Sequence, residues 1–310
     1  MCDFCPLVSI TVLTYNDAEY IVQTLDSIKN QTYQNIELIV SDDCSTDDTV
    51  ERCGRWLEQN RSRFIDVQLL TVEKNTGVTY NITRAQKAAH GVWIKDLGGD
   101  DLLVPNCIEK FVEYIQCNTF VSFVQCRIAQ IDQRGNPVSL YIKKNIPYFW
   151  NKTTSSYQQH QILLRVNPIE TLGLFKKKSM LEDVGYYDLD FPMQEDMSFI
   201  MNTISQGYKV WLLDECLVQR RMHSGSLSGL SDEKLISRND IVRIEVNKKY
   251  FKPYLGWFER GLMSMKDKIN SFFYHTPWLN KKNGLTKLIK RILQSPYTIV
   301  RHIKLRQLIK

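Results

Sequence analysis

Two adjacent carboxylates, Asp100 and Asp101, stand directly after a Gly-Gly pair in the string GVWIKDLGGDD. Carboxylate oxygens are hard ligands that suit Mg2+ or Mn2+, and the glycines allow the backbone to approach a ligand closely. The pair can therefore hold a divalent cation. The alternative is a helix start, where acidic residues interact favourably with the helix dipole.

A second carboxylate pair and a histidine offer further chemistry. Glu195 and Asp196 lie at an expected helix start in MQEDMSFI, so they can supply a general base near a metal site or simply cap the helix. His223, in MHSGSLSG, follows an expected strand and precedes a Gly/Ser loop. It can contact a metal or a phosphate, or it can be an ordinary loop residue.

The first hundred residues alternate between strand and helix patterns. Short β-branched runs predict strands, and apolar residues at helical spacing predict helices between them. This order predicts a mainly parallel sheet with helices on both faces, the α/β class. The expected strands are residues 7–13, 36–40, 67–72 and 92–97. The expected helices are 20–30, 45–57, a helix from the 75–77 turn to about 89, and a helix from about 105.

Polar clusters follow three of these strands at their carboxyl ends. They are Tyr15-Asn16, Asp42-Asp43 and Asp100-Asp101. Ligands of such sheets bind outside the carboxyl ends of the strands. Three clusters on one expected edge therefore predict a binding site there.

The later part of the chain has weaker patterns. DQRGNP at 132–137 predicts a hairpin tip, and the polar, aromatic stretch 143–166 predicts a long loop. A helix is expected at 196–205, closed by Gly207, and strands are expected at 208–213 and 217–222.

Composition excludes two broad classes of protein. The 310 residues are 43% hydrophobic and 24% charged, which is too apolar for a disordered chain. The mean hydropathy of -0.30 is too polar for an integral membrane bundle, and no apolar run approaches the length of a membrane span. The length suits one large α/β domain with an appendage, or two small domains.

Charge is distributed unevenly. Residues 260–310 hold 12 Lys/Arg and one acidic residue, a net charge of +11, whereas the rest of the chain carries −5. Such asymmetry indicates an anionic partner for the tail, either a membrane or a nucleic acid. The acidic body and the lack of a nucleic-acid motif argue against nucleic acid.

The tail begins near residue 256 and contains a basic amphipathic pattern. Such a helix can lie in a membrane interface, or it can dock on the body through its apolar stripe. The apolar residues on one face are Leu285, Leu288, Ile289, Ile292 and Leu293, continued beyond Pro296 by Ile299, Ile303 and Leu308.

The eight cysteines are scattered, and we expect free thiols in a reducing cytosol. Cys2 and Cys5 form one CxxC, but no second pair or His cluster completes a zinc site. No cationic and apolar leader precedes them, so no secretory signal is expected.

Taken in order, the motifs PLVSITVLTYN, IELIVSDDCSTDDT, NTG, GVWIKDLGGDD, QED and HSGSLS resemble the family 2 glycosyltransferases of the GT-A fold. The resemblance covers about residues 6–228, and it is nearest to bacterial enzymes that build O-antigen, capsule and related polysaccharides. It implies a GT-A catalytic domain at 1–228, with a mainly parallel mixed sheet flanked by helices. Residues 229–310 are then a basic, amphipathic helical extension.

The resemblance implies a nucleotide pocket at the first two strand ends. Thr14 and Tyr15 would line it, with the Tyr15 ring against uracil. Asp43 would bind the edge of the uracil, with Asp42 beside it. The family often has an Ala-Arg-Asn string on the following helix; this chain has Asn81-Ile82-Thr83, so Arg84, just beyond, is the candidate contact for the diphosphate.

The resemblance also implies a metal site and a base. Asp100 and Asp101 would hold Mn2+ or Mg2+, Asp101 more directly, and His223 would help to bind the metal-diphosphate. Asp196 would be the catalytic base and Glu195 an acceptor contact. The family often has Asp where this chain has Gly98.

These roles imply an inverting transfer of glucose, galactose or an N-acetyl form from a UDP-sugar to a sugar hydroxyl. The expected acceptor is a lipid-diphosphate-linked GlcNAc or a repeat unit of a surface polysaccharide, and the product a β-linkage. The basic tail would place the enzyme peripherally at the cytoplasmic face of the inner membrane.

Two other functions stay open at this point. A sugar-nucleotide nucleotidyltransferase would need a Gly-rich basic loop after the first strand, and TYNDAE at 14–19 lacks one. A non-catalytic nucleotide-sugar binding protein on the same fold is the other alternative, and the presence of Asp43, Asp101 and Asp196 together argues against it.

Overall fold

The computed structural model describes residues 5–141, 146–223 and 234–309. The chain forms two compact units that alternate along the sequence, and each is described by itself. The first comprises residues 1–145, 169–187 and 208–223, and the second comprises 146–168, 188–207 and 224–310. The expected boundary at 228 lies outside the described residues. The second unit joins segments 146–168 and 188–207 to the C-terminal helices.

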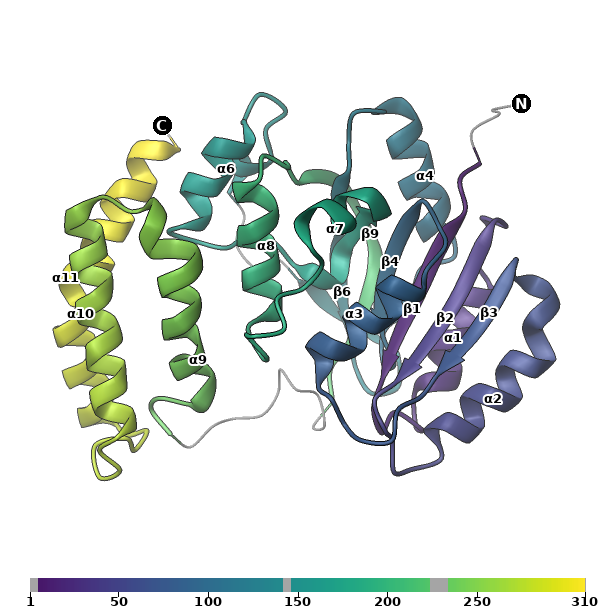
Figure 1. The fold of residues 1–310 in the computed structure, drawn as a ribbon, viewed down its shortest axis with the longest axis horizontal. Coiled ribbons are helices and arrows are strands. Elements are labelled where there is room, and N and C mark those ends of the chain that lie inside the picture. The colour runs from purple at the N-terminus through teal and green to yellow at the C-terminus, as the bar shows by residue number, and fades with distance from the viewer. Residues whose placement is uncertain (1–4, 142–145, 224–233, 310) are drawn as a thin grey trace. The chain divides into compact units, whose positions relative to one another are not determined.

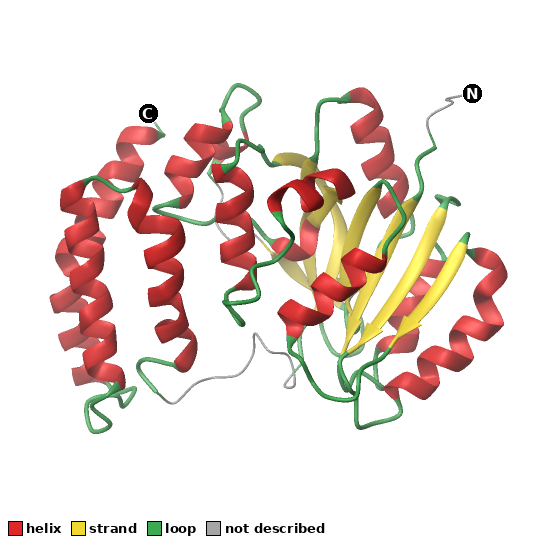
Figure 2. Ribbon diagram, in the orientation of Figure 1, coloured by secondary structure: helices red, strands yellow, loops and turns green. Residues whose placement is uncertain are grey.

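A mixed sheet lies at the centre of the first unit (Figure 2). Its strands run in the order β3-β2-β1-β4-β8-β6-β9-β5, and β7 pairs with β6. β3, β2, β1 and β4 are parallel, whereas β8 is antiparallel to both β4 and β6. The strands are β1 Val8–Thr14, β2 Ile36–Asp42, β3 Asp66–Leu70, β4 Trp93–Gly98, β5 Leu102–Leu103, β6 Phe123–Ile131, β7 Pro137–Tyr141, β8 Leu174–Lys177 and β9 Trp211–Arg221.

Helices cover both faces of this sheet. Figure 1 shows α1 and α2 on one face and α3 on the other. The chain runs outward from β1 to β3 and then returns to β4 on the other side of β1, and right-handed crossovers place the helix of this return on the opposite face. The predicted α/β architecture is therefore confirmed. The helices of the unit are α1 Ile21–Lys29, α2 Thr49–Asn60, α3 Val78–Ala88, α4 Cys107–Cys117 and α7 Lys178–Val184, with short 3-10 turns at Arg61–Arg63 and Thr171–Gly173.

Alternation along β1 builds the core. Val8, Ile10 and Val12 are buried in one apolar cluster with residues of α1, α2 and α4. Ser9 and Thr11 face the other side, where Ser9 donates to Glu37 and Thr11 Oγ1 donates to Asp96 Oδ1 at 2.6 Å. The register pairs Thr14 with Asp42 and Leu13 with Gly98, so the carboxyl ends of three strands meet at one edge.

The second unit is helical. It contains α5 Pro147–Trp150, α6 Ser156–Leu163, α8 Glu195–Ser205, α9 Arg238–Val246, α10 Trp257–Tyr274 and α11 Gly284–Leu308, with a π-helical segment at Asn247–Phe251 and a 3-10 turn at Lys252–Tyr254. α10 and α11 lie side by side (Figure 1). α11 continues through Pro296. Within the described parts of the chain, no helix is long and apolar enough to span a bilayer.

Some sequence-based predictions were wrong. The expected loop 143–166 contains α5 and α6; α6 begins at a capping box in which Ser155 Oγ accepts from the Gln158 backbone N–H at 3.2 Å, and it buries Ile162 and Leu163. The strands expected at 208–213 and 217–222 form one strand, β9. Its pairing with β6 changes register near Arg127. β8 and α7 are too short for a periodic pattern to reveal. Residues 143–145 lie outside the described ranges.

Candidate active site at the carboxyl edge of the sheet

The end of β1 presents an aromatic ring above a fixed turn. Asp17 Oδ2 accepts from Thr14 Oγ1 at 2.8 Å and from the Tyr15 backbone N–H at 3.0 Å. Thr14 is buried at the end of β1, whereas the Tyr15 side chain is 47% exposed. Burial raises the pKa of Asp17 to about 6. The turn therefore holds the Tyr15 ring at the edge, where a flat base can stack against it.

Asp42 and Asp43, at the end of β2, are buried and organise the neighbouring loops. Asp42 accepts from the Ser45 backbone N–H at 2.8 Å and from the Ser45 hydroxyl. Asp43 accepts from the Gly77 backbone N–H at 2.6 Å and from Thr76 Oγ1 at 2.5 Å. Asp43 therefore fixes the predicted NTG turn beside the end of β2.

Arg84, on α3, lies against the same strand end. Its guanidinium donates to Ser41 Oγ at 3.0 Å, to the Asp42 carbonyl at 3.1 Å and to Asn81 Oδ1 at 2.7 Å. It is 3.7 Å from Asp43 Oδ1, and its side chain is only 24% exposed. The structure thus places a cation at the predicted nucleotide edge, held by the strand and by its own helix.

Two glycines shape the end of β4. A Cβ atom at Gly99 would lie 2.5 Å from Asp17 Oδ2 and 3.0 Å from Thr14 Oγ1. A Cβ atom at Gly98 would lie 2.8 Å from Asp100 Oδ1 and 3.1 Å from Asp101 Oδ2. An aspartate at position 98, as the family often has, would force the neighbouring Asp100 and Asp101 carboxylates to shift.

Asp100 and Asp101 point their carboxylates into this turn. Asp101 is 7% exposed and accepts from the Arg221 backbone N–H at 2.9 Å. Burial, followed by the charge of Asp100, raises the pKa of Asp101 to about 8. Asp100 Oδ2 lies 2.9 Å from His223 Nε2, and the His223 ring packs against Tyr20 at 4.8 Å between centroids. Two neighbouring carboxylates that disfavour simultaneous ionisation, next to an imidazole, offer the kinds of ligand atom that a divalent cation takes.

Sequence reasoning missed Arg221, which is 1% exposed. Its guanidinium donates to the carbonyls of Asp100 at 2.9 Å and Gln133 at 2.8 Å, and to Gln23 Oε1 at 2.9 Å. It also stacks over the Tyr20 ring, 4.8 Å from the centroid. Arg221 thereby joins α1, the β6–β7 hairpin and the turn at residues 98–101, which we call the aspartate turn. Its place two residues before His223 was the only signal in the sequence.

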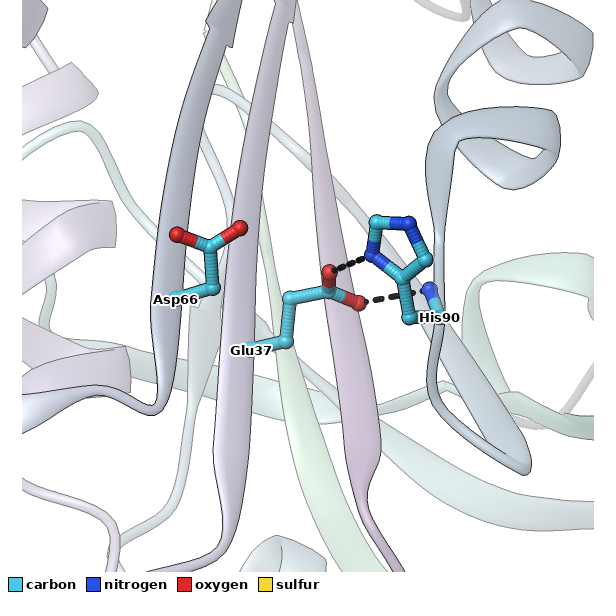
Figure 3. Close-up of side chains that lie close together, drawn as sticks. All are labelled: Glu37, Asp66 and His90. Carbon is cyan, nitrogen blue, oxygen red and sulfur yellow. Dashed lines mark hydrogen bonds and ion pairs between the residues drawn. The ribbon is translucent and has the colours of Figure 1, made fainter.

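A different group of potential metal ligands lies at the opposite edge of the sheet (Figure 3). Glu37, Asp66 and His90 each offer one ligand atom, and these atoms lie within 4.8 Å of one another. His90 already contacts Glu37, with Nδ1 at 2.7 Å and its backbone N–H at 2.8 Å. Glu37 and Asp66 are at the amino ends of β2 and β3, so this group is separate from the aspartate turn.

Glu195 and Asp196 open α8 in the second unit. Asp196 is exposed and Glu195 is partly buried. Gln194 precedes them, and Met193 adopts φ 66°, a left-handed backbone that is uncommon for a side chain of its size. The other predicted site residues gather in the first unit, at one sheet edge. The proposed base therefore belongs to a different compact unit from the proposed metal ligands.

Comparisons with known proteins identify a matching family and similar relatives. The family model described as "Glycosyl transferase family 2" matches residues 9–175. An uncharacterized glycosyltransferase of Haemophilus influenzae is 27% identical over 229 residues, 73% of this chain and 68% of that protein. The Escherichia coli protein named UDP-Glc:alpha-D-GlcNAc-diphosphoundecaprenol beta-1,3-glucosyltransferase WfaP is 25% identical over 240 residues, 76% of this chain and 86% of that protein.

A solved structure has a similar fold. S. aureus TarS 1–349, in complex with UDP-GlcNAc, superposes with a TM-score of 0.62 at 18% identity, covering 98% of this chain and 81% of that one. The predicted GT-A fold is therefore confirmed.

Proposed function

Because the chain belongs to glycosyl transferase family 2, we propose that it transfers a hexose from a UDP-sugar to a sugar hydroxyl and inverts the anomeric centre. The hexose is glucose, galactose or an N-acetyl form. The acceptor is a lipid-diphosphate-linked GlcNAc or a repeat-unit intermediate of a surface polysaccharide, such as an O-antigen or a capsule. One observation carries the proposal: Tyr15, Asp43, Asp101 and His223 all lie at one sheet edge.

Recognition of the nucleotide is assigned to the ends of β1 and β2. The exposed Tyr15 ring stacks on uracil, and Thr14 supports the turn that carries it. Asp43, with Asp42 beside it, orders the loop that borders the base. Arg84 adds positive charge next to these carboxylates, in support of a role toward the diphosphate.

The leaving diphosphate is assigned to the aspartate turn. Asp101, Asp100 and His223 would hold Mn2+ or Mg2+, which would act as a Lewis acid that neutralises charge on the diphosphate. Arg221 keeps this turn in place through its backbone and its guanidinium.

The acceptor is assigned to the second unit. Asp196 accepts the proton of the acceptor hydroxyl while that oxygen bonds to the anomeric carbon and the bond from this carbon to the UDP oxygen breaks. Glu195 binds the acceptor beside it. Attack by that oxygen on the face of the anomeric carbon opposite the departing UDP inverts the centre, so an α-linked donor gives a β-linked product.

Relatives support the choice of substrate class. The name of the WfaP protein states a UDP-glucose donor and a GlcNAc-diphosphoundecaprenol acceptor. A Bacillus subtilis relative, 22% identical over 74% of this chain and 84% of its own length, is named a putative teichuronic acid biosynthesis glycosyltransferase, TuaG. The first name thus states a lipid-linked sugar acceptor, and the second states the biosynthesis of teichuronic acid.

A lipid-linked acceptor requires work at a membrane, and α11 supports peripheral attachment at the cytoplasmic face of the inner membrane. The helix buries Thr286 and Tyr297, yet an apolar row remains exposed about half a turn away. This lipid-facing row consists of Leu285, Leu288, Ile292, Ile299 and Ile303. With a tail charge of +11, the row fits an interfacial helix on anionic lipid.

A thermal-shift comparison tests the nucleotide site. The purified protein is heated with UDP, GDP or dTDP, each with and without Mn2+. A ligand at about 100 times its Kd adds about 2.7 kcal/mol to the stability. We expect the largest shift with UDP plus Mn2+; no shift with any nucleotide would contradict the proposed site, and a shift with GDP or dTDP would change the donor.

A further inference from the structure

The loop that leads to Asp196 is tied down at both of its ends by the C-terminal extension. We call residues 188–194 the loop; they are the part of the connection between α7 and α8 that belongs to the second unit. Every tie comes from residues 239–250, and all of them lie within the second unit. None of these residues falls within the range that the family model matches, 9–175.

The first tie acts directly beside the proposed base. Gln194 immediately precedes Glu195 and Asp196. Its side-chain carbonyl accepts from Arg243 Nη1 at 2.8 Å, and its amide nitrogen donates to Asn239 Oδ1. The Arg243 guanidinium also stacks over the Phe251 ring, 5.2 Å from its centroid. Both hydrogen-bonding ends of Gln194 are therefore committed to α9.

The second tie holds the start of the loop. Asp188 Oδ2 lies 2.6 Å from Lys249 Nζ and accepts from the Tyr250 hydroxyl at 2.5 Å. The Phe191 ring packs edge-on against Tyr250, at 5.9 Å between centroids. A loop fixed at residues 188, 191 and 194 has little freedom to move the first turn of α8.

The π-helical segment Asn247–Phe251 makes this geometry possible. π-helical turns occur often at functional sites, and this one presents Lys249 and Tyr250 together toward the loop. The segment is anchored in turn on α10: the buried Asp267 accepts from Asn247 Nδ2 at 2.9 Å and pairs with Lys252 Nζ at 2.8 Å.

We propose that Asn239, Arg243, Lys249 and Tyr250 form a clamp that positions Asp196, with Arg243 as the principal positioning residue. This inference rests on the proposed role of Asp196 as the base. The C-terminal extension then helps to build the acceptor side of the active site, in addition to any role at a membrane.

Hydrogen exchange tests the clamp without any ligand. The Arg243→Met and Asn239→Ala variants should exchange the amides of residues 190–199 at least fivefold faster than the parent protein. Arg238→Met is the matched control, because Arg238 is an exposed arginine on the same helix. Asn239→Ala removes one hydrogen bond and no charge, so it serves if Arg243→Met folds poorly. Unchanged exchange in Asn239→Ala and in folded Arg243→Met would overturn the proposal.

Kinetics then test the link to the base. UDP release is followed with the UDP-hexose that turns over and a synthetic GlcNAc-diphospholipid. Arg243→Met should lower kcat about 10- to 100-fold with little change in KM for the donor. In an Asp196→Asn background the same change should cost less than twofold, because the positioned group is already gone.

An equal loss in both backgrounds would contradict positioning and indicate a general structural role. If Asp196→Asn alone leaves kcat unchanged, Asp196 is not the base. The proposal that the clamp positions a catalytic base is then also wrong. Hydrogen exchange would still report whether the clamp orders the loop, so the two failures are distinguishable.

Discussion

The backbone N–H of Arg221 donates to Asp101 Oδ1 at 2.9 Å across 120 residues of sequence. The Arg221 guanidinium simultaneously binds the Asp100 carbonyl, also at 2.9 Å. One residue at the end of β9 therefore binds both aspartates of the turn that follows β4. The turn is a product of the whole sheet and not of its local sequence alone.

Replacing Arg221 should loosen this turn. Arg221→Met leaves the Asp100 carbonyl without its donor, and an unsatisfied buried group costs about 1–3 kcal/mol; the carbonyl of Gln133 also loses its donor, but Gln133 is exposed and can bond to water. We expect a loss of about 1–3 kcal/mol in the free energy of unfolding and a smaller shift with UDP plus Mn2+. Urea titration measures the first, with Arg134→Met as an exposed control. A variant as stable as the control would refute the structural role.

Asp101→Asn should separate folding from cation binding. Asparagine keeps an oxygen acceptor for the Arg221 N–H, and it cannot take on the negative charge that burial and Asp100 disfavour at this position. We expect the free protein to be at least as stable as the parent, with the Mn2+-dependent part of the UDP shift lost. Glu58→Gln, on the exposed side of α2, is the control. A retained Mn2+ effect would mean that the cation binds elsewhere.

Asp196→Asn should lower kcat about 10²- to 10⁴-fold, the range typical of a lost general base. Binding of UDP plus Mn2+ should not change, because that site is assigned to other residues. Steady-state kinetics and thermal shift measure the two effects. Asp190→Asn removes an exposed carboxylate from the same loop and should retain activity. Equal kcat values in the two variants would exclude Asp196 as the base.

The pair Asp96–Lys176 predicts a pH dependence of stability. Burial alone would raise the pKa of Asp96, but the Lys176 ammonium and hydrogen bonds from Lys176, Thr11 and Gln86 outweigh it and lower the pKa below 3.8. The unfolded chain then binds more protons than the folded one at acidic pH. The pair therefore stabilises the protein above about pH 4, and this contribution is lost as the pH falls through the folded pKa.

A double-mutant cycle measures this contribution. Asp96→Asn leaves the buried Lys176 uncompensated and should cost about 3–5 kcal/mol at pH 7. The double variant Asp96→Asn/Lys176→Met should recover part of that loss. Unfolding by urea at pH 7 and at pH 3.5 should show a smaller cost at the lower pH. A cost that does not depend on pH would indicate packing in place of charge.

The exposed apolar row on α11, which we propose faces lipid, predicts vesicle binding. Ile292→Asp places a charge in the exposed row, whereas Thr298→Asp adds the same charge outside it. We expect Ile292→Asp to weaken sedimentation with vesicles containing 30% anionic lipid by about tenfold or more. Both positions are exposed, so stability should not change. Equal binding by the two variants would indicate a purely electrostatic attachment, and no binding by the parent would contradict membrane attachment.

Local sequence determined much of the first unit. The strands β1 to β4 and the polar clusters that follow three of them were predictable, because β-branched runs and turn residues act over a few neighbours. Parallel order then brings Thr14, Asp42 and Gly98 to one edge. The family resemblance added roles to these positions, and the family itself is confirmed.

Tertiary structure decided the rest, because it depends on contacts between distant segments. Helix α6, strand β8 and helix α7 are short, and long-range packing outweighs their weak local patterns. The burial of Arg221 and the ties from Arg243 and Lys249 to the loop before Asp196 are formed by residues about 50 to 120 positions apart. Periodicity carries no information about such pairs, so only the folded chain could reveal which side chains hold the site in place.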